Sequence, residues 1–197
     1  MLRIAAVVAD TCAEGPGRRW ALWVQGCSIR CAGCCNPEMF DDRRGQAAEI
    51  ADLAARVAEA RARGVEGVTF LGGEPFEQAA ELATLAGHAR ALAMTVMVFS
   101  GYTLDQLRGR GDAAALLAVT DLLVDGPYDR TRPEPAPPVG RRWIGSANQQ
   151  MHYLTSAYAA GDPRMRDANT IEIRLSRDAL QINGWPTADQ LVRRPRG

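Results

Sequence analysis

The segment VTFLGGEPFEQAAELATLAGHARALAMTVMVF, residues 68–99, contains two short apolar runs on either side of a helical pattern. Residues 68–71 and 95–99 have the length and apolar composition of buried strands. Between them, apolar side chains recur at helical spacing, at Leu82, Leu85, Ala86, Ala89 and Leu92. Because parallel strands need a crossover connection, this order predicts two parallel strands joined by a helix that covers the sheet.

The same alternation continues on both sides of this segment. Residues 21–25 and 122–124 are two further short apolar runs that we predict to be strands. Residues 50–58 repeat the helical spacing, and residues 104–119 are expected to hold one or two shorter helices. Four or five such units are too few to close an eight-stranded barrel. The prediction is an α/β protein with an open, partial βα barrel.

The C-terminal part of the chain has a different pattern. Residues 131–140, TRPEPAPPVG, are rich in proline and are expected to form a loop without regular structure. Two runs of alternating apolar and polar residues then predict a C-terminal β-hairpin over residues 170–184.

The composition argues against several classes of function. Basic and acidic residues number 23 each, so the formal net charge is zero and no global charge draws the chain to nucleic acid or to an anionic membrane. All the basic residues are Arg, which leaves no lysine for a Schiff base. The sequence has no apolar run of membrane-spanning length and no signal peptide, so we expect a cytoplasmic protein in a reducing compartment.

Four of the five cysteines lie together in GCSIRCAGCCNPEMF, residues 26–40. In a reducing compartment such a group indicates metal ligands. Cys27, Cys31 and Cys34 have the spacing C-x3-C-x2-C, whereas a structural zinc site normally needs four ligands in two close pairs. Cys35 is an unfavourable fourth ligand, because adjacent side chains point in diverging directions. Three thiolates on a four-iron cluster would leave one iron open for chemistry.

A second motif, Gly72-Gly73-Glu74-Pro75, follows the predicted strand at residues 68–71. Paired glycines at the end of a strand let a ligand approach the backbone closely. The carboxyl ends of parallel strands are where such sheets bind ligands. Glu74 adds a carboxylate that can accept a hydrogen bond from an ammonium group, and Pro75 can begin a helix because its missing N–H is not needed there.

Together the two motifs resemble those of the radical S-adenosylmethionine (radical SAM) superfamily. The order of five segments is similar to that of the small activating enzymes of the anaerobic ribonucleotide reductase type, relatives of the pyruvate formate-lyase activating enzyme: GCSIRCAGCCNP, GGEPFEQ, FSGYTLDQL, LLVDGPYD and RRWIGSANQ. The resemblance covers about Glu14 to Gln149. It implies a partial barrel of the radical SAM type, in a single domain over residues 1–197 with its core at about 14–150.

The resemblance also implies a set of site residues. A [4Fe-4S] cluster would be held by Cys27, Cys31 and Cys34. The methionyl ammonium of S-adenosylmethionine would be met by Gly72, Gly73 and Glu74, with a charge-assisted bond to the carboxylate. The adenine would lie near the backbone of Gly33, Cys34 and Cys35, and the ribose near Ser100 and Gly101. Asp125 ends a later strand and is expected to face the cofactor or the substrate.

The activity that the resemblance implies is reductive cleavage of S-adenosylmethionine to methionine and a 5'-deoxyadenosyl radical. The partner would be a glycyl-radical protein such as an anaerobic ribonucleotide reductase, and the electron donor a flavodoxin or ferredoxin. Two alternatives stay open: a radical SAM enzyme that acts directly on a small molecule or peptide, and a non-catalytic iron–sulfur or zinc module. Trp143 is either a packing residue or part of a segment that faces the substrate. Without a lysine, the group that binds the carboxylate of S-adenosylmethionine is unassigned.

Overall fold

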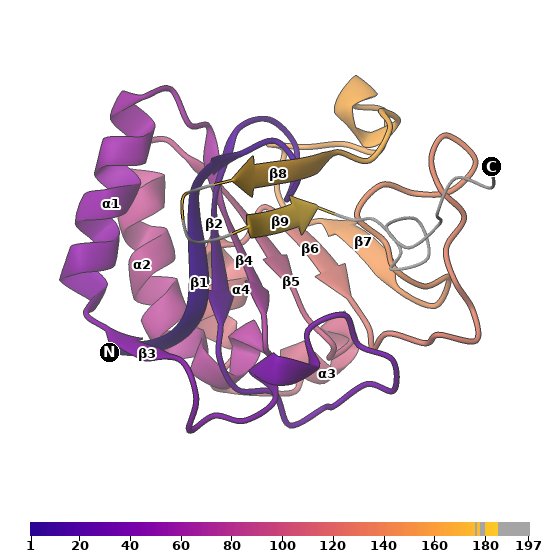
Figure 1. The fold of residues 1–197 in the computed structure, drawn as a ribbon, viewed down its shortest axis with the longest axis horizontal. Helices are drawn as coiled ribbons and strands as arrows, with labels where there is room; N and C mark the ends of the chain where they lie inside the picture. The colour runs from indigo at the N-terminus through magenta and orange to yellow at the C-terminus, as the bar shows by residue number, and fades with distance from the viewer. Residues whose placement is uncertain (176, 178–179, 185–197) are drawn as a thin grey trace.

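The computed structural model describes residues 1–175, 177 and 180–184, and its main element is an open seven-stranded sheet (Figure 1). The strands lie in the order β3-β1-β2-β4-β5-β6-β7. Their bounds are β1 (Leu2–Thr11), β2 (Arg19–Val24), β3 (Gln46–Ala48), β4 (Gly67–Gly72), β5 (Thr95–Phe99), β6 (Leu122–Asp125) and β7 (Gln150–Tyr153). The α/β class is confirmed.

The centre of the sheet is parallel, as the sequence predicts. Strand β4 pairs in parallel with β2 and with β5, and β5 pairs in parallel with β6. Helices connect β4, β5 and β6 to the strand before each, and their bounds are α1 (Ile50–Ala62), α2 (Ala79–Ala91), α3 (Leu104–Arg108) and α4 (Ala114–Val119). The segment 104–119 therefore forms two short helices, as expected. No helix within the described part of the chain is both long and apolar enough to cross a lipid bilayer.

The two edges of the sheet are antiparallel and were not predicted. Strand β1 pairs antiparallel with β2 and with β3, and β7 pairs antiparallel with β6. Only a short loop joins β1 to β2, so no crossover is available and an antiparallel pair results. Because β1 begins at Leu2 and adds Leu2 and Ile4 to the core, the packed structure begins before the region 14–150 of the sequence resemblance.

The two faces of the sheet are covered differently, because side chains alternate along each strand. On one face, Trp20, Leu22, Phe70 and Val98 are fully buried in the main core with residues of the four helices. On the opposite face, the alternate residues of β2 and β4 form a smaller cluster, which includes Trp23. Figure 1 shows the C-terminal hairpin crossing this second face.

The predicted C-terminal hairpin is present. It consists of β8 (Ile171–Leu175) and β9 (Leu180–Gly184), which pair antiparallel, while part of its turn lies outside the described residues. Residues 131–140 have no helix or strand, as predicted, apart from an isolated bridge between Pro133 and Ser146. Three short 3-10 helices complete the described secondary structure: Pro37–Met39, Pro75–Gln78 and Pro163–Met165.

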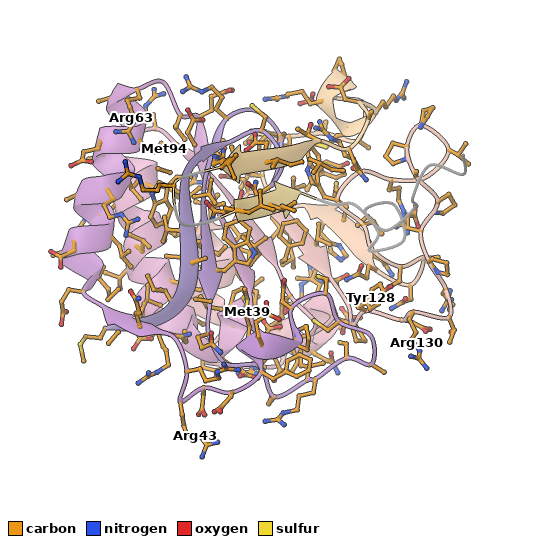
Figure 2. The ribbon with its side chains drawn as sticks, in the orientation of Figure 1. Met39, Arg43, Arg63, Met94, Tyr128 and Arg130 are labelled. Atoms are coloured by element: carbon orange, nitrogen blue, oxygen red, sulfur yellow. The ribbon has the colours of Figure 1, made fainter. Side chains whose placement is uncertain are left out.

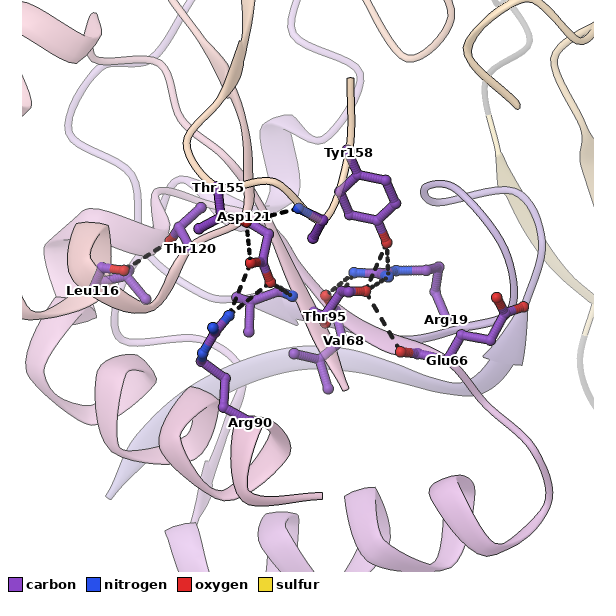
Figure 3. Close-up of polar contacts among 12 residues, drawn as sticks. Arg19, Glu66, Val68, Arg90, Thr95, Leu116, Thr120, Asp121, Thr155 and Tyr158 are labelled. Carbon is purple, nitrogen blue, oxygen red and sulfur yellow. Dashed lines mark hydrogen bonds and ion pairs between the residues drawn. The ribbon is translucent and has the colours of Figure 1, made fainter. Parts of the chain in front are cut away.

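Buried polar side chains join the amino ends of the parallel strands (Figure 3). The guanidinium of Arg19 is fully buried and donates to Thr69 Oγ1 (3.0 Å), Thr95 Oγ1 (2.6 Å) and Tyr158 OH (3.0 Å). Burial lowers the pKa of this guanidinium. Its hydrogen bonds connect β2, β4 and β5 to the segment after β7, so this end of the sheet is held together by polar contacts.

A carboxylate beside β6 forms the second half of this network. Asp121 is buried and accepts hydrogen bonds from Arg90 Nη1 (2.9 Å), from Val96 N (2.8 Å) and from Thr155 Oγ1 (2.6 Å). These contacts join α2, β5 and the segment after β7. The carboxyl ends of the same strands are the ends that lead into the loops with the cysteine and glycine motifs.

Candidate functional site

The cysteine loop leaves the carboxyl end of β2 and is closed by backbone contacts. Gly26 N donates to Met39 O (2.9 Å). The side chain of Gln25 donates from Nε2 to the carbonyl oxygens of Glu38 (3.0 Å) and Asp41 (2.8 Å). Because both ends of the loop are fixed in this way, the cysteines between them are held near the end of the sheet.

The three cysteines of the C-x3-C-x2-C motif are half-buried, and their thiols are not equivalent. A hydrogen bond from the thiol of Cys35 lowers the pKa of Cys34 to about 6. Burial raises the pKa of Cys27 and of Cys31. The hydrogen bond from Cys35 thus favours the thiolate of Cys34, whereas burial disfavours the thiolates of Cys27 and Cys31, and all three cysteines must be deprotonated to ligate iron.

The Gly-Gly turn packs directly on the base of this loop. Gly72 has a φ of +103°, which favours glycine. A Cβ on Gly73 would lie 2.1 Å from the carbonyl oxygen of Gly26, so no larger residue fits. Gly73 N donates to Val24 O (2.8 Å) and Glu74 N donates to Gly26 O (2.8 Å). The two sequence motifs thus form one piece of structure.

Glu74 connects this turn to the loop after β5. It is 1% exposed, and its Oε1 accepts from Phe76 N (2.9 Å) and Ser100 Oγ (2.9 Å). Its Oε2 accepts from Gly101 N (2.8 Å). Burial raises the pKa of Glu74 to about 7, although the hydrogen bonds act in the opposite direction. The carboxylate therefore lacks a cationic partner among the described side chains that pack on it.

The remainder of the GGEPFEQ motif also fixes the cysteine loop. Glu77 Oε1 accepts a hydrogen bond from Ser28 N (2.9 Å), next to Cys27. Gln78 donates from Nε2 to Gln25 O (3.0 Å). These two side chains attach the short helix after the turn to the first residues of the loop, a role that the sequence analysis did not assign.

The predicted site residues border one cavity of about 670 Å³, with two exceptions. Those on its wall are Cys27, Cys31, Cys34, Cys35, Gly72, Gly73, Glu74, Ser100 and Gly101. Gly33 is outside the wall and lies against the side chain of Arg130. Figure 2 labels Met39 and Tyr128, two further wall residues from the loops after β2 and β6.

Asp125 is the second exception, since its carboxylate is directed elsewhere. It is buried, and its Oδ2 accepts from Leu104 N at the start of α3 (2.5 Å). The same oxygen lies 2.9 Å from Nε2 of His152 on β7. After β6, the cavity wall is instead formed by Gly126 and Tyr128.

Further wall residues include Trp143, for which the sequence left two roles open, and others that the sequence did not single out. Trp143 is buried, donates from Nε1 to Ala13 O (3.0 Å) and lines the cavity, so it both packs and faces the site. Glu14 and residues 180–184 of β9 also line it. The sequence predicts the hairpin but carries no local signal for where it packs, because that depends on contacts across more than 150 residues.

The donor set fits an iron–sulfur cluster. The cavity wall carries three cysteine sulfurs, the ligand type that such clusters prefer, beside a turn without side chains. Within the described residues, no group of three His, Cys, Asp or Glu side chains is gathered as around a single metal ion. A four-iron cluster binds each cysteine through a different iron atom, so its ligands do not have to converge on one point.

Comparison with known proteins agrees with this chemistry. Residues 13–152 match the model of the 4Fe-4S single cluster domain, which covers more than half of the chain. The chain belongs to this family. The matched region contains the cysteine loop, the Gly-Gly turn and the central strands, whereas the β8–β9 hairpin follows it.

Several similar proteins carry names that state an activity. Proteins named anaerobic ribonucleoside-triphosphate reductase-activating protein are 33% identical in Salmonella typhimurium over 151 residues and 32% identical in Vibrio cholerae over 149 residues. Each alignment covers 72% of this chain and 92% of the relative. The protein of the same name from Haemophilus influenzae is 30% identical over 153 residues, which cover 71% of this chain and 90% of the relative.

Proposed function

We propose that this chain is a radical SAM activating enzyme. Cys27, Cys31 and Cys34 would hold the [4Fe-4S] cluster, in a single domain whose open sheet is the partial barrel of that superfamily. The observation that carries the proposal is the cavity shared by these cysteines and the Gly72-Gly73-Glu74 turn at the carboxyl ends of neighbouring parallel strands. The names of the relatives support the same class of activity.

Held by these three cysteines, a reduced [4Fe-4S] cluster would supply the one electron needed for reductive cleavage of S-adenosylmethionine to methionine and a 5'-deoxyadenosyl radical, and this radical would take a hydrogen atom from the substrate. The protein binds and orients the reactants. Glu74 would accept from the methionyl ammonium, and a cation there would offset the burial that raises its pKa. Gly72 and Gly73 leave room for the ligand to contact the backbone.

The loop after β5 and the cysteine loop would hold the rest of the nucleoside. Ser100 and Gly101, fixed by Glu74, would lie near the ribose, and the backbone of Gly33, Cys34 and Cys35 near the adenine. Asp125 would act indirectly, because its carboxylate holds the start of α3 behind this loop. Trp143 would exclude water from the far end of the cavity.

The substrate would be a glycine in a large partner protein of the anaerobic ribonucleotide reductase class. Transfer of its hydrogen atom would give 5'-deoxyadenosine and leave a glycyl radical on the partner. A flavodoxin or ferredoxin in the cytoplasm would supply the electron. The relatives' stated role as reductase activators supports this partner over a small molecule.

The test is an anaerobic assay of the iron-reconstituted, dithionite-reduced protein. We expect 5'-deoxyadenosine from S-adenosylmethionine with the wild type and with the Cys12→Ala control, whose cysteine lies outside the motif. The Cys31→Ala variant should give none. Bound zinc in place of iron, or equal product from Cys31→Ala, would contradict the proposal. A glycyl signal by electron paramagnetic resonance after addition of the reductase would separate activation from action on a small molecule.

A further inference from the structure

The β8–β9 hairpin has its apolar side chains on the outside. Its register places Ile173 opposite Ile182 and Leu175 opposite Leu180, so these side chains share one face with Ile171. We call these five residues the aliphatic face. They are 40–83% exposed, and they make up five of the seven large apolar side chains that are exposed in the described part of the chain. Exposed apolar side chains gathered on one face, rather than scattered singly, are a feature of interaction surfaces.

The opposite face of the hairpin is polar and bonded to the protein. Glu172 Oε1 accepts from Cys12 N (2.7 Å), and Arg174 Nη2 donates to Asp10 O (2.5 Å). Asn183 is buried and donates from Nδ2 to Thr11 Oγ1 (2.9 Å). These contacts with the end of β1 fix which face of the hairpin turns toward the body. The exposure of the aliphatic face therefore follows from specific contacts on its other side.

The aliphatic face is continuous with the cavity of the candidate site. Leu180 and Ile182 belong to both, since they also line the cavity wall. Gly184 N donates to Glu14 Oε1 (2.6 Å), and Glu14 is another wall residue. A molecule lying on the face can thus continue into the cavity that holds the cysteines.

We propose that the aliphatic face binds an extended segment of the partner protein that carries aliphatic side chains. This segment would flank the partner's reactive glycine, which would enter the cavity. This inference rests on the proposed function and adds how the partner is recognised. Five residues at about 3.4 Å each give a face about 17 Å long on two strands about 5 Å apart, which matches a short extended segment. The family match ends before the hairpin, so this recognition element lies outside the shared 4Fe-4S domain.

The experiment measures binding and chemistry separately. The probe is the glycyl-radical subunit of the anaerobic ribonucleotide reductase from the same organism, titrated anaerobically into fluorescently labelled, reconstituted enzyme. The test variant is Ile173→Thr/Leu175→Thr, at two exposed positions away from the cavity wall, with residues that keep β propensity. The matched control is Val139→Thr, an exposed apolar residue in the Pro-rich loop.

We expect the dissociation constant to rise at least tenfold in the double variant and to stay within twofold in the control. Production of 5'-deoxyadenosine by the enzyme alone should be unchanged in both, which also reports that both are folded. Equal binding by all three proteins, or no binding by the wild type, would overturn the inference. The inference would also be overturned if sedimentation showed a wild-type dimer that the double variant does not form. The aliphatic face would then bind a second copy of this chain. If the double variant loses binding but the wild type produces no 5'-deoxyadenosine, the proposed function would be refuted and the inference about the aliphatic face would stand.

Discussion

The buried carboxylate of Glu74 makes the pH dependence of stability a direct test of the site. Replacing it by Gln keeps the shape of the side chain but removes the group that ionises. One donor among Phe76 N, Ser100 Oγ and Gly101 N would then face the amide NH2 instead of an oxygen. An unsatisfied buried donor costs about 1–3 kcal/mol, so Glu74→Gln should lower the free energy of unfolding at acidic pH.

The sign of the pH effect follows from the raised pKa. Burial raises the pKa of Glu74 from 4.5 in the unfolded chain to about 7 in the fold, so the folded protein holds the proton more tightly. The resulting stability is fully present below pH 4.5 and is lost as the pH rises to 7. The total is about 3 kcal/mol, of which about 2–3 kcal/mol is lost between pH 5 and pH 8. Glu74→Gln has no such loss.

The assay is urea unfolding of cluster-free protein under reducing conditions at pH 5 and pH 8. The stability difference between wild type and Glu74→Gln should move by about 2–3 kcal/mol in favour of the variant as the pH rises. Glu59→Gln, at an exposed position of α1 that is remote from Glu74, controls for the general effect of removing a carboxylate. A wild-type-to-variant difference that stays constant within about 0.5 kcal/mol, well below the shift expected from linkage, would refute the raised pKa of Glu74.

Three further predictions concern packing and loop attachment. Asp121→Ala should lower the free energy of unfolding by about 3 kcal/mol in urea melts, because it leaves the donors Arg90 Nη1 and Val96 N without an acceptor. A loss of stability below about 1 kcal/mol would count against the network. Gly73→Ala should abolish iron retention, because the added Cβ would collide with the backbone of Gly26. The control Gly87→Ala has open space around it in α2, so it should keep its iron and raise the free energy of unfolding by about 1 kcal/mol. Glu77→Ala should speed iron loss to a chelator by freeing the amide of Ser28, at a stability cost of about 1 kcal/mol; an unchanged rate would show that the attachment is dispensable.

The sequence predicts the parallel centre well because each of its strands is a short, mainly apolar run that is largely buried on both faces. Strand β1 was missed for a physical reason. Its register shifts between Ile4 and Ala6 and again between Val8 and Thr11, and such irregularities break the alternation that marks a strand. Strand β7, QMHY, is short and polar, and pairing with β6 rather than composition makes it a strand.

The candidate site was predictable only where a motif carries it. The cysteines, the Gly-Gly turn and Ser100-Gly101 lie on one cavity because each follows a strand of the same parallel sheet. The direction of the Asp125 carboxylate depends on Leu104 and His152, which no local pattern relates to it. The position of the hairpin likewise depends on hydrogen bonds between distant parts of the chain.

The glycines that follow the parallel strands make much of the cavity floor from main chain. Gly72, Gly73, Gly101 and Gly126 all line it. Backbone amide and carbonyl groups are the same in every residue, so a substitution does not change them. A side chain at Gly73 would also collide with Gly26, so point mutations can change the chemistry of this surface very little. A change in what the cavity accepts therefore has to come from its side-chain walls, such as Trp143 and the hairpin. A substitution in those walls would alter the choice of substrate while the main-chain surface beneath the reactants keeps the same chemistry.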